Sequence, residues 1–203
     1  MSEEELEKLF KAALARQQVG TLEGVKAAEI ISWQAKAEGA ECAIAGGIAM
    51  HLYGYHRATE NVDLLASKPL SLSSEQQLSF GGDRHSIQVG EKNIPVQLIV
   101  RSDVFRVLYE AALRDAVTIA EDRRVIIPEW MVILKFLARR SKDILDLLWM
   151  LKEPGLVNRD RVLQLLEDVL GKPAAHSALR GLEIYYVQAE VMRGGDENGR
   201  QER

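Results

Sequence analysis

Two polar side chains stand at the start of a short apolar segment, residues 61–66, with the sequence NVDLLA. Asn61 and Asp63 are two residues apart, so on a strand they project to one face while Val62 and Leu64 point into the core. Two carboxylates in this arrangement would hold a pair of divalent cations, which position a nucleoside triphosphate and neutralise its phosphates. In this chain one of the two positions carries an amide.

A glycine pair precedes this strand. Gly46 and Gly47 lie between the apolar run 42–45 and a predicted short helix at residues 48–53. Because glycine lacks a Cβ, the backbone can approach a ligand closely, and the N–H groups at the start of a helix can bind a phosphate. A tight strand-to-helix turn also needs glycine for purely structural reasons. The sequence leaves both explanations open.

The segment that connects this helix to residues 61–66 places a basic and a hydroxyl side chain directly before the strand. Arg57 and Thr59 belong to the run GYHRAT, residues 54–59. A guanidinium at this place would add a phosphate contact. We therefore predict that Gly46 and Gly47, together with these two residues, form a nucleotide-binding frame around Asp63, the candidate catalytic residue.

A second charged group lies in residues 130–151, WMVILKFLARRSKDILDLLWML. Its charged members fall on roughly one stripe of a helix: Lys135, Arg139, Lys142, Asp143 and Asp146. An Arg139–Asp143 pair at i, i+4 would stabilise such a helix by only a few tenths of a kcal/mol. A solvated, self-paired face explains these residues without any ligand, and a binding face is the alternative.

The pattern GG-x-A-(x)4-G-(x)2-R-x-T, followed by an apolar strand with Asp63, resembles the polymerase-β-like nucleotidyltransferase superfamily. Within it the chain looks most like the AbiEii-like branch, known from bacterial toxin–antitoxin and abortive-infection systems. The segment 130–151 is similar to that branch's helical motif, in which a Lys precedes a basic-Lys-Asp run and a second Asp. The resemblance covers about residues 40–151.

This resemblance implies Mg²⁺ and an NTP as cofactors, with transfer of NMP to an RNA or protein acceptor. It implies that Lys135 points at the triphosphate and that Asp143 and Asp146 are its polar partners. It also implies metal ligands at three positions, which in this chain are Asn61, Asp63 and, on a later strand, Gln97.

The chain departs from the family at two of these three positions, because Asn61 and Gln97 replace carboxylates. Amide oxygens can ligate a hard cation but bring no charge, so we expect Mg²⁺ and NTP binding to be weakened. Nearby acids do not restore the geometry: Glu60 alternates to the other face, Asp83 falls in a loop, and Asp103 follows the strand. The leading hypothesis is a nucleotidyltransferase-like protein, catalytically impaired, that retains a cleft for a nucleotide or for an RNA or protein partner.

Two alternatives stay open. The first is an active, toxin-like, Mg²⁺-dependent nucleotidyltransferase that moves NMP from an NTP to an RNA or protein acceptor. The second is a non-enzymatic interaction module of a toxin–antitoxin-like pair.

The elements that must position these residues are short strands in the middle of the chain and helices on both sides. We predict an α+β fold, with a nucleotidyltransferase-like mixed sheet flanked by helices and a helical C-terminal subdomain. The predicted parts are N-terminal helices at 1–39, the α/β core at 40–127, the helical subdomain at 128–193 and a disordered tail at 194–203. The predicted helices are 2–18, 22–37, 48–53, 104–116, 129–140, 143–152, 159–169 and 173–192, and the predicted strands are 42–45, 61–66, 86–89, 94–100, 117–120 and 125–127, with a long loop at 67–84.

Composition narrows the class of protein. The chain has 203 residues and a net charge of −4, which gives no general reason to expect binding to nucleic acid or to a membrane surface. A single cysteine, Cys42, excludes an intramolecular disulfide framework and a multi-cysteine zinc site. No apolar run reaches the length of a membrane span, so a cytoplasmic location is expected. The oligomeric state stays open.

Overall fold

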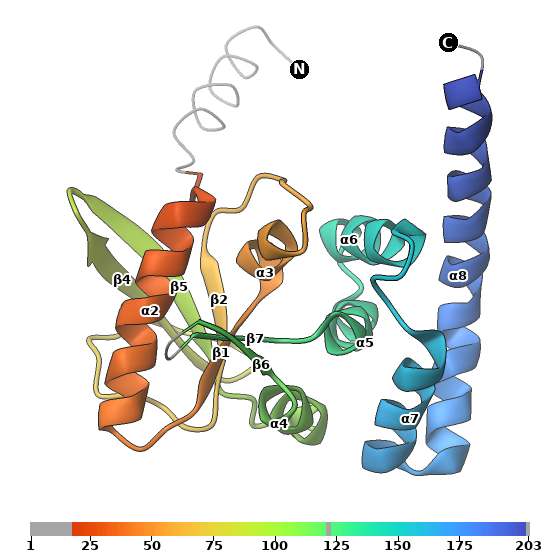
Figure 1. The fold of residues 1–203 in the computed structure, drawn as a ribbon. Coiled ribbons are helices and arrows are strands. Elements are labelled where there is room, and N and C mark those ends of the chain that lie inside the picture. The colour runs from red at the N-terminus through yellow and green to blue at the C-terminus, as the bar shows by residue number, and fades with distance from the viewer. Residues whose placement is uncertain (1–17, 121–122, 202–203) are drawn as a thin grey trace, which may run out of the picture. The chain divides into compact units, whose positions relative to one another are not determined.

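The computed structural model describes residues 18–120 and 123–201, and the chain forms two compact units, Met1–Val100 and Arg101–Arg203 (Figure 1). Within the described residues the first unit contains a sheet and two helices, α2 (Thr21–Ala37) and α3 (Gly46–Leu52). The second contains a hairpin and five helices. The α+β class and the helical C-terminal part predicted from the sequence are confirmed.

The sheet of the first unit is mixed. Its strands lie in the order β3-β4-β5-β2-β1. Strand β2 is antiparallel to β1 and parallel to β5, whereas β4 is antiparallel to both β3 and β5. The bounds are β1 (Cys42–Ala45), β2 (Val62–Ala66), β3 (Gln76–Gln77), β4 (Gly82–Val89) and β5 (Lys92–Ile99).

Along β5, and over the first three residues of β2, residues alternate between an apolar face and a face that carries polar side chains. Val62, Leu64 and Val96 have no exposed surface. Helix α2 contacts β1, β2, β4 and β5 and, together with α3, covers this apolar side. The residues between them, Asp63 and Gln97, are half-buried on the other face.

Helix α2 begins and ends within a residue of its prediction, but its large apolar residues do not form its packing face. Leu22 and Trp33 are 65% and 54% exposed. The buried side carries mostly small residues: Gly24, Ala27, Ala28, Ile31, Ser32 and Ala35. Small side chains let the helix approach its neighbours closely, and a Cβ on Gly24 would lie only 2.4 Å from Cδ1 of Ile48.

The loop predicted at 67–84 is partly wrong, because it contains β3 and the start of β4. Gly81 and Gly82 favour a turn, yet Gly82 already pairs with Ile99. Its φ is +94°, and a Cβ there would lie 2.0 Å from the backbone oxygen of Leu98. Glycine at this position therefore permits close strand pairing rather than a turn.

The second unit begins with α4 and the β6–β7 hairpin and continues through four further helices. Trp130 and Ile133 of α5, Leu147 of α6 and Val162 of α7 form its core. The left-handed Arg139, with φ +53°, ends α5, so residues 129–152 form two helices, in agreement with the predicted helices 129–140 and 143–152. The bounds are α4 (Arg106–Arg114), β6 (Val117–Ala120), β7 (Arg123–Val125), α5 (Pro128–Ala138), α6 (Ser141–Lys152), α7 (Arg159–Leu170) and α8 (Lys172–Gln201).

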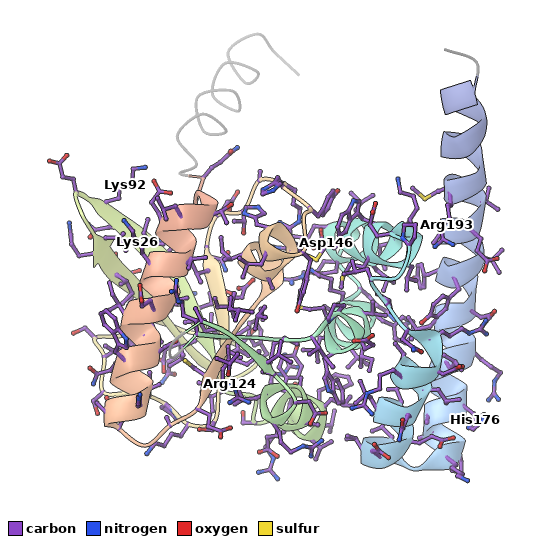
Figure 2. The ribbon with its side chains drawn as sticks, viewed as in Figure 1. Lys26, Lys92, Arg124, Asp146, His176 and Arg193 are labelled. Carbon is purple, nitrogen blue, oxygen red and sulfur yellow. The ribbon has the colours of Figure 1, made fainter. Side chains whose placement is uncertain are left out.

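Two arginines cap helix ends in this unit (Figure 2). Arg193 of α8 donates to the backbone oxygens of Leu151 and Lys152 at the end of α6, each at 2.9 Å. Arg124 of β7 donates to Leu113 O at 2.9 Å, at the end of α4. These contacts satisfy carbonyl groups that have no partner inside their own helix.

The predictions for the two ends of the chain have different outcomes. Helix α8 continues to Gln201, so the disordered tail predicted from 194 is not what the structure describes. Extending an existing helix adds one backbone hydrogen bond per residue without a new nucleation step. This explains how the polar residues at the end of α8 can continue the helix. The helix predicted at 2–18 lies outside the described residues. None of the helices in the described part of the chain combines the length and apolar character needed to cross a membrane.

Candidate functional site

The side chain of Asp63 is held by its neighbour on the same strand face. Asn61 Nδ2 donates to Asp63 Oδ1 at 2.5 Å. A carboxylate at position 61 would repel Asp63 unless a cation lay between them. The amide instead supplies a donor, so it engages one carboxylate oxygen that a cation would use.

The strand register brings Gln97 directly beside this pair. Asp63 of β2 is the Cα partner of Gln97 in β5, as expected from the resemblance. Gln97 is in turn the partner of Arg84 in β4. The polar face of the sheet therefore carries the row Asp63, Gln97, Arg84.

The glycine pair is fitted to the same side chains. Gly46 has φ +57°, and a Cβ on it would lie 1.8 Å from Oδ2 of Asp63. A Cβ on Gly47 would lie 2.3 Å from Oγ1 of Thr59. The structural explanation of these glycines thus has a specific form: they make room for Asp63 and Thr59. Their predicted contact with a phosphate stays a prediction.

The segment that carries Arg57 and Thr59 is pinned at both ends. Thr59 Oγ1 donates to Asn61 O at 3.1 Å, and Thr59 O accepts from the backbone N–H of Val19 at 2.8 Å. His51 Nε2 lies 2.6 Å from Arg57 O, while His51 Nδ1 lies 3.0 Å from Thr21 Oγ1. The buried His51 therefore positions the Arg57 backbone. Sequence reasoning missed this role because nothing in the spacing of the histidines indicates it.

The donor set on this face does not fit two Mg²⁺ ions. It offers one carboxylate and two amides, and the amide nitrogen of Asn61 points at that carboxylate. No group of three or more His, Cys, Asp or Glu side chains suited to a metal occurs in residues 18–120 and 123–201.

Neighbouring acids do not add a carboxylate to this donor set. Glu60 is exposed, and Asp83 is the partner of Leu98, which places it on the opposite face from Gln97. Asp103 is held by Arg101, with Arg101 Nη2 2.6 Å from its Oδ2.

The predicted helical motif forms a buried ion cluster within the second unit. The side chains of Lys135 and Asp143 are 6% and 3% exposed, and that of Asp146 is fully buried. Lys135 Nζ donates to Asp146 and lies 3.6 Å from Oδ1 of Asp143. Figure 2 shows Asp146 on α6. A solvated face is therefore the wrong explanation for these three residues, although Arg139 and Lys142 are exposed.

The break at Arg139 explains the pairing. Because α5 ends there, the expected Arg139–Asp143 pair does not form, and Arg140 Nε instead contacts Asp143 Oδ2 at 2.6 Å. The guanidinium of Arg139 lies over the Phe136 ring. Any phosphate bound by Lys135 would have to compete with two carboxylates, so its predicted role in nucleotide binding stays a prediction, as do those of Asp143 and Asp146.

Comparison with known proteins adds a resemblance in structure. No protein-family model and no curated protein matches the sequence. A crystal structure of an antigenic nucleotidyltransferase-like protein from Paracoccidioides brasiliensis aligns with 81% of this chain and 95% of its own, at 18% identity and a TM-score of 0.48.

Proposed function

We propose that this chain is a nucleotidyltransferase-like protein that binds the phosphates of a nucleotide beside Asp63 without metal-dependent transfer. The observation that carries the proposal is the contact between Asn61 Nδ2 and Asp63 Oδ1. It turns the position of a second metal ligand into a hydrogen-bond donor. Gln97, opposite Asp63 in the register, brings no charge at the third position.

The frame around this face supports retention of binding. Gly46 and Gly47 leave room for the side chains of Asp63 and Thr59, and His51 fixes the backbone of Arg57. This frame fixes the backbone of Arg57, whose guanidinium lies 2.9 Å from Ala58 O, and the hydroxyl of Thr59 at the start of β2, without requiring a cation. Binding of the phosphates then depends on charge-assisted hydrogen bonds.

The first test is titration of ATP, GTP, CTP and UTP by calorimetry and thermal shift, with Mg²⁺ and with EDTA. We expect at least one NTP to bind equally in both conditions, and Arg57→Gln to weaken it about tenfold, because one charged phosphate contact is lost. Arg106→Gln is the matched control, since Arg106 is a surface residue that pairs with Glu110 at 3.6 Å. No NTP binding at millimolar concentration would remove the nucleotide proposal and favour an interaction module.

The second test separates a binder from an enzyme. We expect the native chain to incorporate no labelled nucleotide into RNA or protein, and Asn61→Asp with Gln97→Asp to gain Mg²⁺-dependent incorporation. Gln88→Asp with Asn93→Asp adds the same charge to an exposed pair of Cα partners on β4 and β5 and should gain nothing. Labelling by the native chain that Asp63→Ala abolishes would show that the transferase is active.

A further inference from the structure

A cavity of about 420 Å³ lies in the first unit, where residues 76–80 meet β4 and β5. Its volume falls in the range of small-molecule sites. Gln97 lines it, so the cavity borders the polar face that carries Asp63. The remaining lining residues are Gln76, Gln77, Leu78, Ser79, Phe80 and Arg84.

Arg84 has an unmet donor in this wall. The Arg84 side chain as a whole is 42% exposed, but its Nε is buried and has no hydrogen-bond partner among the described residues. The carboxylate of Glu75 lies 3.8 Å away, beyond hydrogen-bond distance, and the Glu75 side chain is 52% exposed. A buried charged donor without an acceptor is unfavourable, and an anion in the cavity would supply the acceptor.

The other lining groups indicate what the anion is attached to. Phe80 offers a ring on which a planar base can stack. The amides of Gln76, Gln77 and Gln97 each present a donor and an acceptor, which suits the edge of a nucleobase. The guanidinium of Arg84 is a planar fork that matches phosphate oxygens.

We propose that this cavity binds a nucleoside monophosphate unit. Its phosphate lies on Arg84, its base on Phe80, and the base edge on the glutamine amides. This site is separate from phosphate binding beside Asp63 and shares only Gln97 with it. A free nucleotide and the 3′-terminal nucleotide of a single-stranded RNA present the same chemistry.

The test measures binding of 5′-AMP and of inorganic phosphate to the full chain by calorimetry. We expect 5′-AMP to bind more tightly than phosphate, Arg84→Gln to weaken 5′-AMP at least about tenfold, and Arg106→Gln to change nothing. Equal affinities for 5′-AMP and phosphate, or no effect of Arg84→Gln, would overturn the proposal.

Glu75→Gln provides a second variant that does not depend on how Arg84→Gln folds. It removes the negative charge 3.8 Å from Arg84 Nε, so 5′-AMP should bind a few-fold more tightly. If Arg84 and Glu75 formed only a structural pair, Glu75→Gln would leave 5′-AMP affinity unchanged or lower it, which contradicts the proposal.

Two further titrations identify the source of the bound nucleotide and distinguish the two sites from each other. A short oligoadenylate with a free 3′ end is titrated beside 5′-AMP, and the tighter ligand is assigned as the source. Arg57→Gln should weaken ATP but not 5′-AMP. If ATP fails to bind while 5′-AMP still depends on Arg84, the phosphate site beside Asp63 is wrong and this cavity stands; the reverse pattern overturns the cavity alone.

Discussion

The two polar clusters of this chain are opposites in burial and in charge. On the first unit's sheet, Asp63 stands half-buried between two amides, Asn61 and Gln97. In the second unit, Asp143 and Asp146 are buried with Lys135. Two carboxylates pair with a lysine between two helices in one cluster, whereas a single carboxylate lies beside two amides in the other. The comparison indicates that stability requires the second cluster much more than the first.

The largest effect is expected from breaking the buried cluster. Asp146→Ala leaves Lys135 desolvated with one partner fewer, and such a loss costs about 3–5 kcal/mol of unfolding free energy. Urea unfolding measures it. The double variant Lys135→Met with Asp146→Leu should recover much of this loss, because no uncompensated charge stays buried. A loss below about 1 kcal/mol for Asp146→Ala would contradict the assigned role.

Gly46→Ala should have an intermediate effect in the first unit. Alanine at this position must adopt an unfavourable φ of +57°, and its Cβ collides with Asp63 Oδ2. We therefore expect the unfolding free energy to fall by about 1–3 kcal/mol. Asp63→Ala in the same chain should restore part of it by removing the colliding atom. Gly54→Ala is the control for backbone strain alone, since its φ is +99° and nothing lies within 4 Å of the Cβ. Equal losses at both glycines, with no rescue, would show that the collision is unimportant.

A smaller effect is expected from Asp63→Asn, and it sharpens the contrast with Asp146. Asp63 is half-buried and accepts from a neutral amide, so removing its charge should change the unfolding free energy by less than about 1 kcal/mol. Urea unfolding beside Asp146→Asn makes the comparison direct. A loss at position 63 as large as that at position 146 would end the distinction between the clusters.

The smallest effect concerns Asp115, a carboxylate of the second unit outside both clusters. Burial raises its pKa, but hydrogen bonds from Arg114 and from Trp130 Nε1 at 2.9 Å outweigh burial, so the net pKa is lowered. A lowered folded-state pKa gives stability that is present above the unfolded-state pKa and is lost as pH falls through the folded value. Asp115→Asn should therefore flatten the acid side of the stability curve slightly, as measured by thermal unfolding between about pH 5 and pH 2.

The sequence predicted the position of the candidate site better than its surroundings. The family resemblance placed Gln97 together with Asp63, and the parallel register of β2 and β5 makes the two residues Cα partners. The packing face of α2 could not be identified from the sequence. The helix has small residues on one side and large apolar residues such as Trp33 on another, and hydrophobicity alone favours the side with the large residues.

The missed features depend on contacts distant in sequence. A charged stripe such as Lys135 with Asp146 has the same spacing whether water or another helix covers it, and only the break at Arg139 decides which. Arg84 was missed because Gly81 and Gly82 indicate a loop, which conceals the alternation of β4.

The most direct test of the central claim is calorimetric titration of Mn²⁺ into the native chain and into the Asn61→Asp, Gln97→Asp variant, with Gln88→Asp, Asn93→Asp as the charge-matched control. If the two amides prevent metal binding beside Asp63, Mn²⁺ should bind saturably to the Asn61→Asp, Gln97→Asp variant and to neither the native chain nor the control. Saturable Mn²⁺ binding by the native chain that Asp63→Ala abolishes would contradict it.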